Sequence, residues 1–299
     1  MSAERQVEGK SPQQSTGHQS VDGLIVSQAV KDLPRFIQSI PFVFPDEFIA
    51  TYAMKISDKT KGFLPIIVSS HTSHLDGLPL SVVAKILTDM TNLISGEHRL
   101  KGFTVPIAAS METGNQGSIV KKATEHIKKI MAQQYNLQTM PYVRAKDEKQ
   151  YDIPRDRHKF LRDLTEQVRN GYGLALFPEA TMQGGRTKRR IFGRTERFGM
   201  QEFKYMEAIA AIAKRTGKEP LYIPIGIDGG FRLESPDNNR PTLAYLREIF
   251  LTQPAQTKLV NARVGLPITQ KEIGSADIND FLGKTVAGLL PEKARGVYA

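Results

Sequence analysis

A histidine and an aspartate five residues apart are the strongest chemical signal in this chain. His71 follows a short apolar run, and Asp76 precedes the next amphipathic one. Where the chain turns between two such elements, the carboxylate can accept a hydrogen bond from one ring nitrogen, and the other nitrogen can take a proton. The pair therefore predicts a general base.

The same spacing occurs a second time, at His158 and Asp163. This second pair lies inside a predicted helix over 155–170. Residues five apart on a helix are about 140° apart around its axis and do not face each other. We interpret it as a solvated helix face, whereas the first pair lies in a strand-to-helix turn, where α/β sheets place active sites.

The segment around the first pair leaves two alternatives open: a metal site at His71, His74 and Asp76, or a nucleophile among Ser69, Ser70 and Ser73. The metal would need a further ligand cluster, and none is evident. The nucleophile would be expected in a Gly-x-Ser-x-Gly turn, which the chain lacks. We therefore favour the general base, with His74 in a structural role at the helix start.

Two further segments are rich in groups that bind phosphate. An apolar strand ends at Phe177, and Pro178 forces an extended exit that brings Glu179 and Thr181 to where a substrate would lie. A basic run follows, with Arg186, Lys188, Arg189, Arg190, Arg194 and Arg197. These cations suit a phosphate site through charge-assisted hydrogen bonds, or a solvated loop on an anionic membrane. Arg144 ends another short strand and could aim its guanidinium at a phosphate, with an ordinary surface residue as the alternative.

Apolar strands and amphipathic helices alternate along most of the chain. The predicted strands are 64–68, 104–109, 140–143, 174–177, 221–227 and 259–264, and the predicted helices are 78–93, 119–131, 155–170, 203–215 and 278–290. The alternation predicts an α/β fold with a mixed, largely parallel central sheet flanked by helices.

The N-terminal part of the sequence differs from the rest. Residues 1–20 are polar and read as a disordered tail. Residues 21–56 are predicted as an N-terminal helical segment, and 57–299 as the α/β domain. The apolar stretch 40–49 is expected to pack on the main core, with a membrane-facing or acyl-facing element as the alternative.

Composition narrows the class of function. The 299 residues include no cysteine, which excludes a thiol nucleophile, cysteine zinc sites and iron–sulfur clusters. The net charge of +10 predicts anionic partners, while the absence of tryptophan disfavours a base-stacking surface, so nucleic acid is not expected. No apolar run reaches the ~18 residues that cross a bilayer. We expect a cytoplasmic protein, with peripheral contact with the inner face of an anionic membrane as a further option.

Taken in order, these segments resemble the glycerolipid acyltransferase family, which includes glycerol-3-phosphate and 1-acylglycerol-3-phosphate acyltransferases. The matching blocks are His71 with Asp76, Arg144, Phe177-Pro178-Glu179-Ala180-Thr181, Ile223-Pro224-Ile225 and Val264-Gly265-Leu266-Pro267-Ile268. Ala180 and Met182 stand where many members have glycine and arginine. The resemblance spans about residues 60–268.

The resemblance implies transfer of a fatty acyl group from an acyl-CoA or acyl carrier protein thioester to a hydroxyl of glycerol 3-phosphate or 1-acylglycerol 3-phosphate. His71 would be the catalytic base, oriented by Asp76. The substrate-binding residues would be Arg144, Glu179, Thr181, Arg186 and Lys188. No metal or organic cofactor is implied. The alternatives are an acyltransferase for another lipid or a sugar, and a non-catalytic basic protein that binds lipid or nucleic acid.

Overall fold

The computed structural model describes residues 40–57, 62–71, 76–95, 100–108, 128–143, 152–179, 189–191, 194–196, 199–229 and 260–299. The predicted polar tail 1–20 and the first part of the 21–56 segment lie outside these ranges, as does most of the predicted helix 119–131. Its last turns are described, and residues 128–135 are helical.

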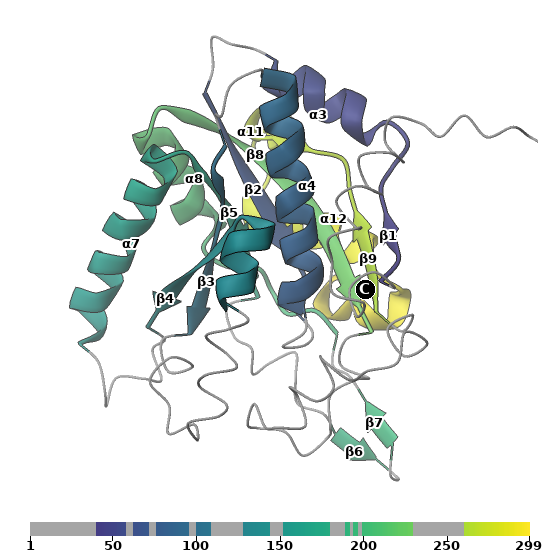
Figure 1. The fold of residues 1–299 in the computed structure, drawn as a ribbon. Helices are drawn as coiled ribbons and strands as arrows, with labels where there is room; N and C mark the ends of the chain where they lie inside the picture. Colours follow the sequence, from purple (N-terminus) through teal and green to yellow (C-terminus); the bar gives the residue numbers. More distant parts are fainter. Residues whose placement is uncertain are drawn as a thin grey trace, which may run out of the picture.

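Most of the described strands form one twisted sheet (Figure 1). The strands are β1 (Phe42–Val43), β2 (Gly62–Ser69), β3 (Gly102–Ala108), β4 (Leu137–Tyr142), β5 (Tyr172–Leu176), β8 (Lys218–Asp228), β9 (Asn261–Val264) and β10 (Ile268–Thr269). Their order is β1-β9-β8-β2-β5-β3-β4, with β10 beside β8. Only β8 with β9 and β8 with β10 pair antiparallel, so the sheet is mixed and largely parallel.

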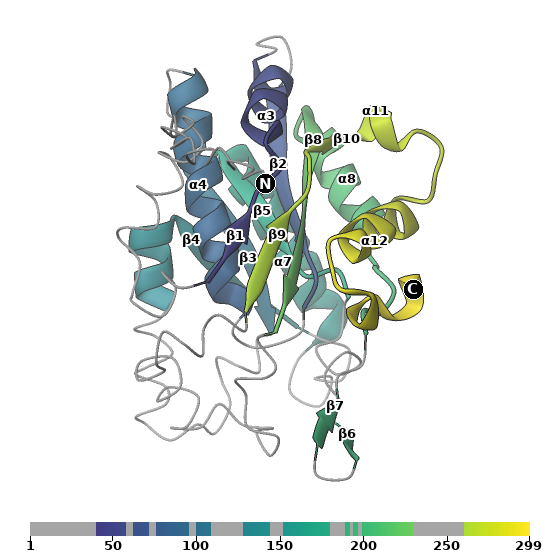
Figure 2. The ribbon, with the colours of Figure 1, turned by 90° about the vertical axis from the view of Figure 1, so that its right-hand side faces the viewer.

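Helices cover both faces of this sheet (Figure 2). They are α3 (Phe48–Ile56), α4 (Gly77–Ser95), α7 (Ile153–Arg169), α8 (Met206–Arg215), α11 (Gln270–Ile273) and α12 (Ile278–Gly288), followed by the short 3₁₀ helices η4 (Glu292–Ala294) and η5 (Gly296–Tyr298). The side chains of α4 pack in one buried cluster with those of α3, and the side chains of α7, α8 and α12 pack in another. The α/β fold predicted from the sequence is confirmed.

Alternation along the central strands explains the two layers. In β2, Leu64, Ile66 and Val68 face the α8 and α12 side, while Ile67 faces α4. A strand buried on both faces is expected to be largely apolar, and residues 64–68 of β2 are all apolar. The sheet is therefore sandwiched between two hydrophobic cores.

The two central strands β2 and β5 send the chain to opposite faces of the sheet. They pair in parallel, with Val68 opposite Leu176, so their carboxyl ends lie side by side. After β2 the next described helix is α4, on one face, and after β5 it is α8, on the other. In α/β proteins, ligands commonly bind outside the carboxyl ends of the strands where such a divergence occurs.

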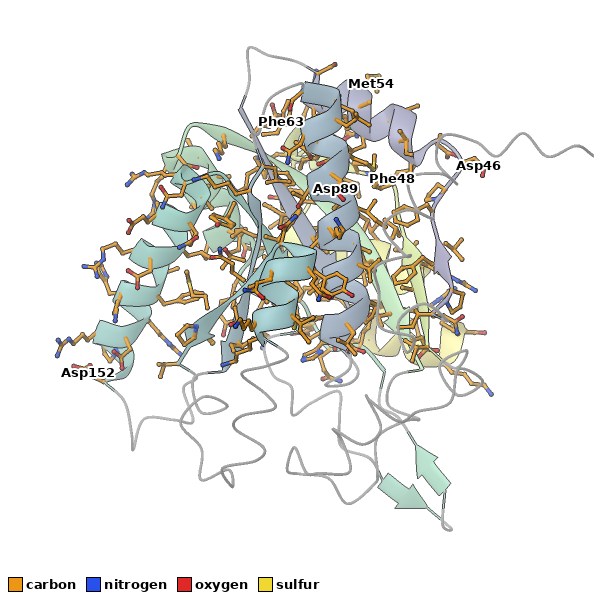
Figure 3. The ribbon with its side chains drawn as sticks, viewed as in Figure 1. Asp46, Phe48, Met54, Phe63, Asp89 and Asp152 are labelled. Carbon is orange, nitrogen blue, oxygen red and sulfur yellow. The ribbon has the colours of Figure 1, made fainter. Side chains whose placement is uncertain are left out.

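The N-terminal apolar stretch belongs to the main core, as expected. Ile40 and Phe48 are buried in the same cluster as α4, and Figure 3 shows Phe48 beside that helix. The structure differs from the predicted helical segment in one respect: Phe42–Val43 is a strand, parallel to β9. Prolines at 41 and 45 disfavour helix there, and the partner strand lies more than two hundred residues away in sequence, so local periodicity cannot predict the pairing.

Among the described helices, none combines the length and the hydrophobicity that crossing a bilayer requires.

Close contact between β5, β3 and β2 yields a stability prediction at Gly173. A Cβ atom placed there would lie 2.7 Å from Cε1 of Phe103 and 2.8 Å from the carbonyl oxygen of Pro65. We expect Gly173→Ala to lower the free energy of unfolding by roughly 1–3 kcal/mol, measured by urea titration. The control is Gly288→Ala, whose Cβ meets nothing within 4 Å; equal stability of the two variants would contradict the packing described.

Candidate active site

His71 lies two residues beyond the end of β2, and the chain leading to it is firmly held. The hydroxyl of Ser70 donates to the carbonyl oxygen of Ile227 (3.0 Å) and accepts from the Ile227 amide (2.9 Å). The Ser70 amide donates to the carbonyl oxygen of Ile225 (3.2 Å). These bonds continue the pairing of β2 with β8 past the last strand residue, so His71 starts from a fixed backbone.

Asp76 lies directly before α4 and faces the imidazole of His71. Nδ1 of His71 and Oδ2 of Asp76 are 3.2 Å apart, and the Asp76 side chain is fully buried. An ionised carboxylate only accepts hydrogen bonds, so the proton of this pair belongs on Nδ1. The positive end of the α4 dipole favours the negative charge at this position.

Phe177, the first residue after β5, holds the imidazole from a different direction. Its ring stacks on that of His71 at a centroid distance of 4.1 Å and an interplanar angle of 22°. The stack and the carboxylate together limit rotation of the imidazole, whose side chain is 12% exposed. A histidine oriented in this way can take a proton at Nε2, the nitrogen that does not face Asp76.

Glu179 lies in the turn after β5 and binds main-chain groups. Its Oε1 accepts from the amide of His71 (2.8 Å), and its Oε2 accepts from the amide of Gln201 (3.1 Å). The residue is 5% exposed. The sequence predicts that Glu179 lines an acceptor site; the structure adds that its carboxylate joins the backbone of His71 to the segment that precedes α8.

The structure excludes two of the three serines that were considered as a nucleophile. Ser69 and Ser70 are fully buried, and their hydroxyls bind backbone carbonyl groups. They stabilise the end of β2 and cannot meet a substrate. Ser73 lies outside the described residues.

The metal alternative requires His74, which also lies outside the described residues. Within the part of the chain that the structure describes, no three histidine, aspartate or glutamate side chains are grouped so that they could hold a metal ion.

The second pair with this spacing is arranged as predicted. His158 and Asp163 both lie on α7, and His158 is exposed. Asp163 accepts a hydrogen bond from Nε of its neighbour Arg162 at 3.4 Å. Figure 3 shows Asp152 at the start of this helix, where its side chain accepts from the Arg155 amide and caps the first turn.

The structure thus brings together three of the predicted site residues: His71, Asp76 and Glu179. Arg144, Thr181, Arg186 and Lys188 lie outside the described residues. Arg144 directly follows Val143, the buried residue after β4. Part of the basic run forms a two-stranded hairpin, β6 (Arg189–Ile191) with β7 (Arg194–Glu196), drawn apart from the main sheet in Figures 1 and 2.

No protein-family model matches the chain, and no curated protein is similar enough to be counted as a match.

The two bonds of Glu179 yield a prediction for the stability of the site. In Glu179→Gln one side-chain oxygen is replaced by an NH₂ group, which cannot accept from a backbone amide. A buried donor without a partner costs ~1–3 kcal/mol, so we expect the urea midpoint to fall accordingly. The control is Glu202→Gln, an exposed change on the same segment. A midpoint equal to that of the control would show that the carboxylate does not bridge the two amides.

Proposed function

We propose that this protein is an O-acyltransferase, which moves a fatty acyl group from a thioester to a hydroxyl of a phosphorylated glycerol. The observation that carries the proposal is the His71–Asp76 pair at the carboxyl edge of the two central strands, supported on its other side by Phe177. The order of the sequence blocks that resemble glycerolipid acyltransferases supplies the reaction class.

The proposed reaction begins with removal of a proton. Nε2 of His71 takes the proton of the acceptor hydroxyl as the oxygen attacks the thioester carbonyl carbon, and Asp76 stabilises the resulting imidazolium. The tetrahedral intermediate then expels the thiolate by breaking its carbon–sulfur bond. The thiolate receives the proton from the imidazolium, so the products are an ester and a thiol. A covalent acyl-enzyme is not needed.

Burial of the pair supports this assignment. Asp76 is fully buried, so its carboxylate has one stable arrangement with the ring and is poorly screened by water. The ring is mostly covered, which restricts the access of water that would otherwise compete with the acceptor hydroxyl.

The proposed acceptor is the one that the family resemblance implies, and the positive charge of the chain is compatible with it. A phosphorylated glycerol needs cations near its phosphate, and Arg144, Arg186 and Lys188 are the residues proposed for this role. The net charge of +10 also suits peripheral attachment to an anionic bilayer, where an acylated acceptor and its product would reside.

Substitution of the catalytic pair tests the mechanism. We expect His71→Ala and Asp76→Ala each to lower kcat by ~10²–10⁴-fold, because general-base assistance is lost. Release of thiol from acyl-CoA in the presence of glycerol 3-phosphate can be followed with a thiol-reactive dye, and the chain itself contains no cysteine to interfere.

The chain supplies a matched control for this experiment. His158→Ala and Asp163→Ala remove the pair of equal spacing on α7 and should leave the rate unchanged. A His71→Ala enzyme that works at a near-normal rate would refute the mechanism, provided that its circular dichroism matches that of the wild type.

Arg144 yields a separate prediction about the acceptor. Arg144 directly follows Val143, the buried residue after β4, and β4 lies three strands from β2 in the sheet. We expect Arg144→Ala to raise the KM for the phosphorylated acceptor about tenfold or more, with the KM for acyl-CoA unchanged. An unaltered acceptor KM would mean that the phosphate is bound elsewhere.

A further inference from the structure

The segment Glu292–Tyr298, which comprises η4 and η5, packs against the backbone just before α8. The amide of Met200 donates to the carbonyl oxygen of Ala294 (3.0 Å), and the amide of Val297 donates to the carbonyl oxygen of Met200 (3.1 Å). Met200 is fully buried. Both main-chain groups of this residue are thus bound by a segment more than ninety residues away in sequence.

Two glycines allow the backbones of these two segments to touch directly. A Cβ on Gly199 would lie 2.2 Å from Cα of Gly296, and a Cβ on Gly296 would lie 2.1 Å from the carbonyl oxygen of Met200. Gly296 also has a φ of +60°, which disfavours other residues. Because no side chain lies between the two segments, their backbones are in direct contact, and the distance between them is fixed.

Tyr298 makes the third attachment to the same backbone. Its hydroxyl accepts from the amide of Phe203 (2.8 Å), and its ring meets that of Phe203 edge-on. The ring also lies on Gly283 of α12, where a Cβ would come within 2.3 Å of the hydroxyl oxygen. Burial raises the pKa of Tyr298, so the group stays a neutral hydroxyl at physiological pH.

The backbone held in this way is joined to the candidate active site. The amide of Gln201 donates to Glu179, whose other oxygen accepts from the amide of His71. The amide of Lys204 donates to the carbonyl oxygen of Pro178 (2.9 Å), beside Glu179. Residues 199–204 therefore lie between the Glu292–Tyr298 segment on one side and the turn that carries Glu179 on the other.

We infer that Tyr298 is a positioning residue for His71. Its hydroxyl fixes residues 199–204, these fix the carboxylate of Glu179, and that carboxylate fixes the main chain of the proposed base. The effect on catalysis rests on the proposed acyl transfer, whereas the effect on the His71 backbone does not. The inference assigns a role in the site to a residue more than two hundred positions from His71 in sequence.

The test is Tyr298→Phe, which removes the hydroxyl and keeps the ring. We expect kcat to fall roughly tenfold, because small displacements of a reacting group are costly, while both KM values stay within about twofold of the wild type. The matched control is Tyr222→Phe. Tyr222 is fully buried in the same core, and its hydroxyl donates to Gln270 rather than to residues 199–204. This variant should keep the wild-type kcat.

Amide hydrogen exchange supplies a readout that does not depend on activity. In Tyr298→Phe the amides of His71, Gln201 and Phe203 should exchange faster than in the wild type, whereas in Tyr222→Phe they should be unchanged relative to the rest of the sheet. Gly296→Ala, with Gly288→Ala as its control, should reproduce the same pattern without altering a tyrosine.

The outcomes separate the two proposals. If the wild type transfers no acyl group, or if His71→Ala remains active, the proposed function fails, and amide exchange still decides the inference about Tyr298. If the wild type is active and His71→Ala is not, a Tyr298→Phe enzyme with normal kcat and normal exchange at His71 overturns the inference. Equal losses of kcat in Tyr298→Phe and Tyr222→Phe would also overturn it, because they would reflect stability alone.

Discussion

Glu179 carries the constraint on which the site depends, because it is a buried carboxylate that must find partners inside the protein. A charge that leaves water without hydrogen bonds is strongly unfavourable. Here two backbone amides supply those bonds, one from His71 and one from Gln201, which lie on opposite sides of Glu179 in sequence. Satisfying one side chain therefore fixes the turn after β2 and the approach to α8 relative to the end of β5.

Other contacts converge on the same edge of the sheet. The hydroxyl of Ser70 ties the end of β2 to β8, and Phe177 at the end of β5 supports the imidazole. The strands β2, β5 and β8 thus each contribute to the surroundings of His71. Ser70 follows β2, Phe177 follows β5, and Ile227 of β8 binds the hydroxyl of Ser70.

Local sequence signals predicted much of the fold because the central elements are long and strongly patterned. The apolar runs in β2, β5 and β8 and the amphipathic helices α4, α7 and α12 lie close to where periodicity places them. β1 and β10 are only two residues long, and their partner strands are distant in sequence. Pairing of this kind is determined by the assembled sheet, so it cannot be predicted from the residues that neighbour each strand in sequence.

The parts of the candidate site that depend on side-chain type could be predicted from the sequence. The hydrogen bonds to main-chain amides could not. His71 and Asp76 could be identified because their types and their strand-to-helix context are visible, and that context distinguishes them from His158 and Asp163. The hydrogen bonds of Glu179 to two amides, and that of Tyr298 to the amide of Phe203, could not be predicted from residue type. Any residue offers a main-chain N–H, so only the folded chain reveals which ones are used.

The order in which these parts leave the ribosome has a consequence for the nascent protein. Synthesis proceeds from the amino end, and His71 is made long before Gly296 and Tyr298. During translation the histidine and its carboxylate are already present, but the backbone contacts that steady their surroundings are not. A nascent chain would therefore carry His71 and Asp76 before the contacts of Gly296 and Tyr298 have formed around them.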